Sequence, residues 1–188
     1  MKEIRLHGIG GLGTVKAGEI LVHAAVLDGK FGNSTPFFGF ERQGAPVTSF
    51  VRLDDRKIRP KNQIYHPNCV IVIDPSLLVS APVFEGIAPE SFFILNTKSD
   101  DIAKLAEHET IRTVAYLNAT QIALDVLGRA IPNTVMLGAF VRATGWVRKD
   151  LLEQKVEEFF GTKNVVAFNR GFDEVQIRHF DVKSVISM

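Results

Sequence analysis

The chain has 188 residues, of which 46% are hydrophobic and 23% are charged, and this is typical of one folded domain with a sizeable core. With 22 basic and 21 acidic residues, its net charge of +1 gives no support for binding to nucleic acid or to a membrane surface. No stretch approaches the roughly 20 apolar residues of a membrane span and the start lacks a signal-peptide pattern, so we expect a cytoplasmic protein.

The first elements are a short strand, a glycine-rich turn and a helix. Ile4 and Leu6 lie on one face and Arg5 and His7 on the other, as in a short strand. Helical spacing follows the turn and continues as far as Gly29, which suits a helix end. Strand, turn and helix in this order predict a Rossmann-like opening βαβ unit.

Glycine and proline are dense over residues 31–46, which favours a second short strand followed by a shaped loop. Residues 47–54 alternate again and predict a clear strand. Residues 56–60 suit the hairpin return of that strand. Cys69, the only cysteine, stands beside the apolar run VIVID. We interpret it as a buried structural thiol, and one thiol excludes an internal disulfide or a cysteine-held iron–sulfur cluster.

Three apolar runs, over residues 69–74, 91–97 and 113–120, predict strands that are buried on both faces of a parallel sheet. Each run ends in polar residues, and in open α/β sheets this edge is where ligands usually bind. We expect these residues to cap the segments that follow rather than to act in catalysis. They are Asp74, Asn96, Thr97, Asn118 and Thr120.

Helical patterns fill most of the rest. Residues 101–109 suit an amphipathic helix, and another helix begins near Asn118. In the helical pattern after Pro132, Gly138 is small enough to let another backbone approach closely. A helix over residues 148–161 is expected to bury Leu151, Leu152, Val156, Phe159 and Phe160. Together these elements predict a single α/β domain over residues 1–188, with a mainly parallel sheet flanked by helices.

Gly8, Gly10 and Gly13 fit the G-x-G-x-x-G spacing of a dinucleotide-binding turn. Such a site also needs an acidic residue about 20 positions further on, which holds the ribose hydroxyls. This chain has FGNSTP at that distance, with no Asp or Glu. Two interpretations of the turn stay open: close packing between strand and helix, or a helix N-terminus whose amides hold a phosphate.

Three stretches together resemble one family: GIGGLGTVKAGEIL, FFGFERQGAPVTSFVR and PNTVMLGAFVRATG. With VIVIDPSLL and ILNT between them, their order and spacing are similar to the gamma subunit of the 2-oxoacid:ferredoxin oxidoreductases, the pyruvate synthase group. The string G-x-E-R-x-G-A-P, from Gly39 to Pro46, is the most specific part. The resemblance covers nearly the whole chain and favours pyruvate or a branched-chain oxoacid as the substrate.

The resemblance implies that the complete enzyme converts a 2-oxoacid and coenzyme A to acyl-CoA, CO₂ and reduced ferredoxin. Partner subunits of alpha, beta and delta type would then hold the thiamine diphosphate, the Mg and the iron–sulfur clusters, and this chain would bind none of them alone. A thiamine-type G-D-G with a downstream asparagine is absent from the sequence. The chain would be a structural subunit on the coenzyme A side of the active site.

The same resemblance implies the binding residues. Coenzyme A is the expected cosubstrate. The residues expected to bind it are Gly8, Gly10, Gly11, Gly13, Glu41, Arg42 and Gly44. No catalytic or metal-ligating residue is expected in this chain. Arg142 and Arg148 suit contacts with phosphates, since arginine binds them well, but are also common as surface residues. His7 is interpreted as a satisfied structural histidine.

The glycine-rich loop also carries Phe37, Phe38 and Phe40. Exposed phenylalanines form an apolar patch, and such a patch favours contact with a partner protein. At least one of them is therefore expected to become buried only in the complex. The alternative function is that of a stand-alone oxidoreductase of Rossmann type, dependent on NAD(P) or flavin, which would use Gly8–Gly13. A third possibility is a sensor or adaptor with the same fold.

Overall fold

The computed structural model describes residues 1–38, 44–100, 102 and 108–180. Seven strands form one sheet within this part of the chain, in the order β2-β3-β1-β4-β5-β6-β7. The strands are β1 (Lys2–Ile9), β2 (Phe31–Phe38), β3 (Pro46–Asp54), β4 (Cys69–Val72), β5 (Ser91–Asn96), β6 (Ile111–Leu117) and β7 (Gln176–His179).

The centre of the sheet is parallel. β1, β4, β5 and β6 pair in parallel, as their uninterrupted apolar runs predict. β3 is antiparallel to both β1 and β2, and β7 is antiparallel to β6. β2 therefore runs in the direction of β1, and the sheet is mainly parallel, as expected. The opening β1–helix–β2 unit is present, but β3 lies between its two strands.

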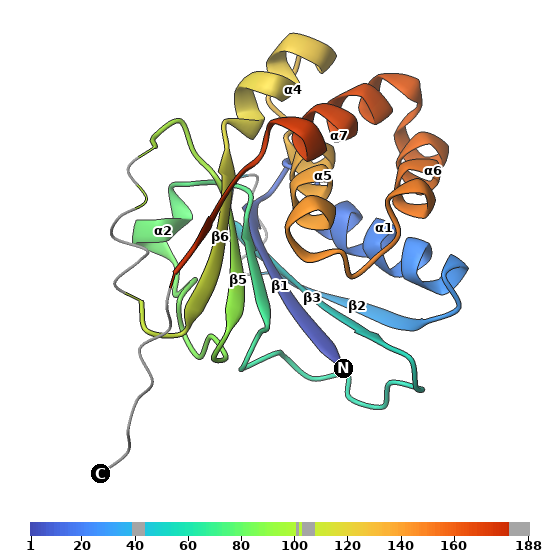
Figure 1. Ribbon diagram of the computed structural model, residues 1–188, viewed down its shortest axis with the longest axis vertical. Coiled ribbons are helices and arrows are strands. Elements are labelled where there is room, and N and C mark those ends of the chain that lie inside the picture. Colours follow the sequence, from blue (N-terminus) through green and yellow to red (C-terminus); the bar gives the residue numbers. More distant parts are fainter. Residues whose placement is uncertain (39–43, 101, 103–107, 181–188) are drawn as a thin grey trace.

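Helices cover the two faces of the sheet unequally (Figure 1). α1, α5, α6 and α7 lie over one face, α4 lies at the end of β6, and the short α2 lies on the opposite face. The helices are α1 (Thr14–Leu27), α2 (Leu77–Ser80), α4 (Ala119–Leu127), α5 (Asn133–Thr144), α6 (Lys149–Phe160) and α7 (Thr162–Glu174). The domain is thus a single α/β unit with a large helical layer on one side.

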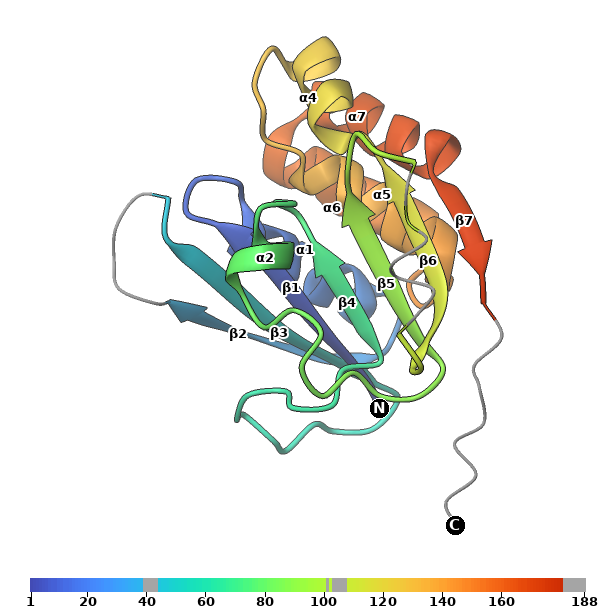
Figure 2. The same cartoon turned by 90° about the vertical axis from the view of Figure 1, so that its left-hand side faces the viewer.

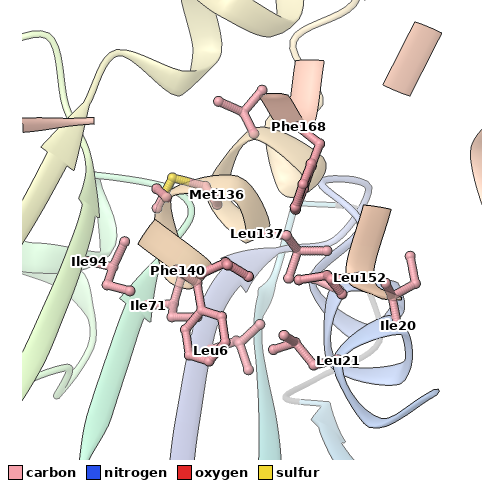
Figure 3. Packing of buried hydrophobic residues seen from close by; sticks show 14 of the residues in the cluster. Leu6, Ile20, Leu21, Ile71, Ile94, Met136, Leu137, Phe140, Leu152 and Phe168 are labelled. Atoms are coloured by element: carbon pink, nitrogen blue, oxygen red, sulfur yellow. The ribbon is translucent and has the colours of Figure 1, made fainter. Parts of the chain in front are cut away.

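α5 is the central helix of that layer. Every residue from Asn133 to Val141 is buried. Met136, Leu137 and Phe140 pack toward the strands and toward α7, where Phe168 meets them (Figure 3). The same cluster includes Leu6, Ile71 and Ile94 from the strands, Ile20 and Leu21 from α1, and Leu152 from α6.

Glycines allow α5 and α7 to approach closely. A Cβ atom on Gly138 would lie 2.0 Å from the carbonyl oxygen of Phe168, and one on Gly171 would lie 2.1 Å from that of Val135. Because the atoms in the way are backbone, no rotamer change can relieve either clash. The close backbone approach expected at Gly138 is confirmed.

Residues 56–60 form no strand, so the predicted hairpin return of β3 is wrong, and this segment is a loop. In α6, Leu152 and Val156 are buried as predicted, but Phe159 and Phe160 are each 37% exposed. These two rings are only partly covered, because Phe159 packs edge-on against His23 of α1 and Phe160 packs against Phe159. The helix expected over residues 101–109 lies almost wholly outside the described residues.

Candidate functional site

The glycine-rich turn connects β1 to α1. Gly13 precedes α1 in the left-handed conformation at φ 75°, and no side chain caps the first turn of the helix. A Cβ on Gly8 would lie 2.0 Å from Oγ1 of Thr14, and one on Gly13 would lie 2.4 Å from Nδ2 of Asn133. Glycine at these two positions lets the side chains of Thr14 and Asn133 pack directly against the turn. The first interpretation of the turn is correct for these two residues.

Gly11 differs from its neighbours. It is exposed, its φ is 98°, and a Cβ built on it would meet nothing within 4 Å. Its positive φ favours glycine, but packing does not. The open space in front of Gly11 leaves room for a ligand to approach the backbone, as the second interpretation of the turn requires.

A second loop lies beside this turn. The backbone N–H of Gly10 donates a 2.9 Å hydrogen bond to the carbonyl oxygen of Ala45. Gly44, next to Ala45, is exposed with φ 87°. The structure therefore brings Gly10 and Gly44 into the same region, as the predicted binding set requires. Glu41 and Arg42 lie outside the described residues.

The third motif stretch reaches the same place through Asn133, the first residue of α5. Its side chain is buried, and Nδ2 donates a 3.5 Å hydrogen bond to the carbonyl oxygen of Gly13. In the sequence, Pro132 and Asn133 suit a turn or a helix start, and this pattern alone gives the asparagine no further role. Its position in the quoted stretch PNT was the signal that it belongs with the glycine turn.

A pocket of about 290 Å³ opens between the glycine turn and the start of α5, and no described residue of the loop at Gly44 lines it. It contains two cations, Lys16 on α1 and Arg129 after α4. Lys16 pairs with Glu19 at 2.6 Å, whereas Arg129 has no ion pair with any described carboxylate. Uncapped N–H groups at a helix start together with two cations suit a phosphate group. The lining residues are Gly11, Gly13, Lys16, Leu127, Arg129, Ile131, Asn133, Phe160 and Asn164.

The environment of β1 does not suit a dinucleotide. In a Rossmann site the second strand pairs with the first and carries the ribose-binding acid at its end. Here the antiparallel β3 occupies that place, with Pro46 opposite Ile9. β2 ends in Phe37 and Phe38, so no acidic side chain stands at its described end. Both observations agree with the missing acid in the sequence.

The polar residues at the carboxyl edge of the sheet make structural hydrogen bonds. Oδ1 of Asp74 accepts from the backbone N–H of Ser76 at 2.9 Å, and Oδ1 of Asn118 caps α4 by accepting from the N–H of Gln121 at 3.1 Å. Nδ2 of Asn96 donates to the carbonyl of Ile73 at 2.8 Å, which ties the ends of β4 and β5 together. Capping rather than catalysis is the role that these contacts support.

Thr97 and Thr120 follow the same pattern. Oγ1 of Thr97 accepts from the backbone N–H of Ser99 at 3.0 Å. The backbone N–H of Thr120 donates to Oδ1 of Asn96 at 3.2 Å, and its hydroxyl accepts from Nδ2 of the same residue at 2.8 Å. These threonines stabilise the loops after β5 and β6.

Two arginines that were considered for phosphate binding have other partners. The guanidinium of Arg142 lies 5.2 Å from the ring centroid of Phe172 on α7. Arg148 forms an exposed ion pair with Asp150, and this hydrogen bond raises the pKa of the arginine. Neither residue lines the pocket at the glycine turn.

His7 and Cys69 are buried, as expected. Nε2 of His7 accepts a 2.9 Å hydrogen bond from Nε of Arg5, which agrees with a satisfied structural histidine. Burial and the positive charge of Arg5 lower the pKa of His7 to about 3. Burial raises the pKa of the Cys69 thiol, so this cysteine is not a nucleophile at neutral pH.

Within the described residues, no three side chains among His, Cys, Asp and Glu gather as metal ligands would. Every helix in the same part of the chain is too short or too polar to cross a membrane.

Comparisons with known proteins agree with the resemblance seen in the sequence. The family model described as pyruvate ferredoxin/flavodoxin oxidoreductase matches residues 3–174. The pyruvate/ketoisovalerate oxidoreductases common subunit gamma of Pyrococcus furiosus is 42% identical over 184 residues, which cover 94% of this chain and 98% of the relative. The gamma subunit of the NADH-dependent phenylglyoxylate dehydrogenase of Aromatoleum evansii is 41% identical, covering 96% and 97%.

A solved structure shows the same fold. The pyruvate oxidoreductase subunit PORC from Thermotoga maritima superposes with a TM-score of 0.83 at 34% identity, covering 95% of this chain and 98% of the other. All three proteins are named as subunits. None of these names supports a stand-alone oxidoreductase dependent on NAD(P) or flavin.

Proposed function

Because the chain belongs to the pyruvate ferredoxin/flavodoxin oxidoreductase family, as a gamma-type subunit, we propose that it works in a multisubunit enzyme that oxidises pyruvate. The reaction converts pyruvate and coenzyme A to acetyl-CoA and CO₂, and ferredoxin takes the two electrons. Residues 1–188 form one gamma-type domain of this enzyme. Subunits of alpha, beta and delta type are its partners.

The chemistry of the reaction belongs to those partners. Cys69 is buried and is the only cysteine of the chain, so it cannot provide the four thiolates that hold an iron–sulfur cluster. No described carboxylates gather to hold the Mg that accompanies thiamine diphosphate. In this proposal the chain is a structural subunit on the coenzyme A side, and its partners supply the thiamine and iron–sulfur ligands.

One observation carries this assignment: the three stretches that mark the family meet at the end of β1. Gly10 bonds to the carbonyl of Ala45, and Asn133 bonds to the carbonyl of Gly13. Binding residues are concentrated on loops that a rigid scaffold holds in place, and the sheet holds these loops together. The cations Lys16 and Arg129 suit the phosphates of coenzyme A.

We assign the binding role residue by residue. Gly11 offers open backbone, Gly10 and Gly44 bring the two loops together, and Gly8 and Gly13 hold the turn against its neighbours. Glu41 and Arg42 belong to the same binding set because the family string contains them. Coenzyme A would approach along the N-terminus of α1.

The test is anaerobic purification of the tagged chain from its own cells, followed by identification of the copurified proteins. The complex is then assayed with pyruvate, with a branched-chain oxoacid and with phenylglyoxylate, each with ferredoxin or NAD as acceptor. Copurification of alpha-, beta- and delta-type subunits with CoA-dependent reduction of ferredoxin by pyruvate is the expected result. A chain that purifies alone contradicts the proposal, and preference for another oxoacid changes only the substrate.

A further inference from the structure

The sheet has one face that the described helices leave open. α2 lies in front of the central strands, and no described helix covers β2 and β3 on that side (Figure 2). A pocket of about 610 Å³ occupies this face. Its floor is made by side chains from β1, β3 and β2, and its walls are residues 63–66 and 82–86. The pocket is separate from the one at the glycine turn, with which it shares no lining residue.

Two buried arginines on this face hold the walls in place. Nη2 of Arg5 donates to the carbonyls of Val83 and Glu85, at 2.9 and 2.8 Å. Nη1 of Arg52 donates to the carbonyl of Asn62 at 2.8 Å. Each guanidinium thus clamps one loop to the sheet. The pocket is a built feature of the fold rather than a gap between mobile segments.

The floor of the pocket has unused donors. Arg5 is 7% exposed and His7 is 5% exposed, and both line the pocket. Arg5 forms no ion pair with a described carboxylate, and its Nη1 has no hydrogen-bond partner among the described residues. His7 accepts through Nε2, so the neutral ring carries its proton on Nδ1. Burial lowers the pKa of Arg5, and the nearby carboxylate of Glu85, another lining residue, partly offsets this without forming an ion pair with it. The free Nη1 of Arg5 and the Nδ1–H of His7 can still donate to a carboxylate, so this floor favours one.

The rim of the pocket is aromatic. Phe37 is 50% exposed and Tyr65 is 63% exposed, and both line the pocket beside the buried ring of Phe50. Exposed aromatic side chains around a concave site are typical of the centre of a protein interface. They would pack against an apolar side chain that stands next to the carboxylate.

A basic stretch leads into one wall of the pocket. Arg56, Lys57, Arg59 and Lys61 are exposed and form no ion pair with any described residue. Asp54 and Asp55 precede this stretch, so residues 54–61 carry a formal charge of +2, from four cations and two carboxylates. The whole chain carries only +1. Positive charge is therefore concentrated in the loop that leads to the wall residue Gln63, and this favours an acidic partner over a second copy of the same basic surface.

We propose that this pocket is the docking site for an acidic segment of another subunit of the same enzyme. One carboxylate of that segment enters the pocket and binds Arg5 and His7. A neighbouring apolar side chain packs against Phe37 and Tyr65. Further acidic residues face Lys57 and Lys61. The inference rests on the proposed function, because it takes its partner from the assembled oxidoreductase.

The first experiment uses the intact complex and a zero-length carbodiimide reagent, which joins lysines to carboxylates in direct contact. Peptide mass spectrometry identifies the linked residues. We expect Lys57 or Lys61 to be linked to an aspartate or glutamate of one partner segment. Hydroxyl-radical footprinting of the same complex should show Phe37 and Tyr65 at least fivefold less reactive than in the isolated chain. Val166 on α7, also about half exposed, is the internal reference.

The second experiment measures assembly with variants at the rim, since replacing Arg5 would also release a wall of the pocket. Phe37→Ser, Tyr65→Ser and Lys57→Glu change exposed side chains. Each should weaken association of this chain with its partner subunits by tenfold or more. Val166→Ser and Lys163→Glu make matched changes on α7 and should leave the association unchanged.

The outcomes separate the two proposals. A chain that copurifies with no partner overturns the proposed function, and this inference with it. A complex in which Phe37 and Tyr65 stay as reactive as in the isolated chain overturns only the inference. Cross-links that join Lys57 or Lys61 solely to a second copy of this chain would also overturn only the inference. The same holds if the rim variants assemble with the partner subunits as well as the α7 control variants do.

Discussion

Arg5 and His7, two residues apart on β1, share a hydrogen bond of 2.9 Å between Nε of the arginine and Nε2 of the histidine. Both side chains are buried on the face of the sheet that the described helices leave open. Burial, and then the positive charge of the neighbouring guanidinium, keep the imidazole neutral by lowering its pKa. A buried cation and a neutral histidine thus stand side by side at the centre of the fold.

The first prediction concerns the pH dependence of stability. The pKa of His7 is about 3 in the folded chain, because of burial and of Arg5, and about 6.5 in the unfolded chain. Below pH 6.5 the unfolded chain binds a proton that the folded chain does not, so stability falls as the pH falls toward 3. From pH 7 to pH 5 this one group should lower the free energy of unfolding by about 2 kcal/mol.

The measurement is chemical denaturation at several pH values. His7→Gln keeps a neutral acceptor for Arg5, and its stability should fall less steeply between pH 7 and 5. His23→Gln removes an exposed histidine from α1 and is the control. Glu85 and His66 also line the pocket, so their neutral variants test whether they contribute. Equal slopes for wild type and His7→Gln would contradict the prediction.

The second prediction concerns the contact between α5 and α7. Replacing glycine by alanine inside a helix normally stabilises it by about 1 kcal/mol. For Gly138→Ala we expect the opposite sign, a loss of about 2 kcal/mol or more, because the added methyl meets backbone atoms of α7. Denaturant titration of the purified chain measures this change.

Gly18 on α1 provides the matched comparison. A Cβ there would lie 2.5 Å from Oγ of Ser49 and 2.8 Å from Oγ of Ser34. These are hydroxyl groups that rotate away at small cost, so Gly18→Ala should destabilise the chain by less than Gly138→Ala. If both variants lose the same stability, backbone contact is not what makes Gly138 necessary.

The third prediction tests the glycine turn as a coenzyme A site. In the assembled enzyme, Gly11→Ala should raise the KM for coenzyme A by about fivefold to tenfold, the effect of losing roughly one hydrogen bond. The KM for pyruvate should not change. The added methyl meets nothing within 4 Å in the chain itself, so an effect on this KM reports a contact made from outside the chain.

Gly29→Ala is the control for backbone strain. Gly29 follows α1, and like Gly11 it has a positive φ and no neighbour within 4 Å of an added Cβ. Both changes should cost about 1 kcal/mol of stability. If Gly29→Ala raises the KM for coenzyme A as much as Gly11→Ala does, the effect comes from instability and not from the site.

The fourth prediction concerns Cys69. Its thiol is buried between β1 and β5, and burial raises its pKa. Iodoacetamide should therefore label it about a thousandfold or more slowly in the native chain than in denaturant, because labelling needs the strands to open. A Lys163→Cys, Cys69→Ala double variant carries an exposed thiol instead and should be labelled at once. Rapid labelling of native Cys69 would contradict its structural role.

Local patterns in the sequence predicted much of the fold. Alternation placed Ile4 and Leu6 on one face of β1 and Arg5 and His7 on the other, and both placements are confirmed. The predicted cap at Asn118 and the close approach at Gly138 are confirmed by their contacts. These features depend on residues that are close in the chain, or on the size of one side chain. The prediction of a hairpin after β3 is wrong, because charged and apolar residues in a loop can alternate without forming strand-to-strand hydrogen bonds.

The family could also be identified from the sequence, since three short stretches carry it. What the sequence by itself determined is which residues alternate, which cap, and that no cysteine ligand set is present. Only the tertiary structure decided that β3 lies between β1 and β2, that Asn133 reaches Gly13, and that Arg5 and Arg52 clamp two loops over an open face. The physical reason is that strand order, register and the targets of buried arginines depend on pairings between distant segments, which periodicity along the chain does not encode.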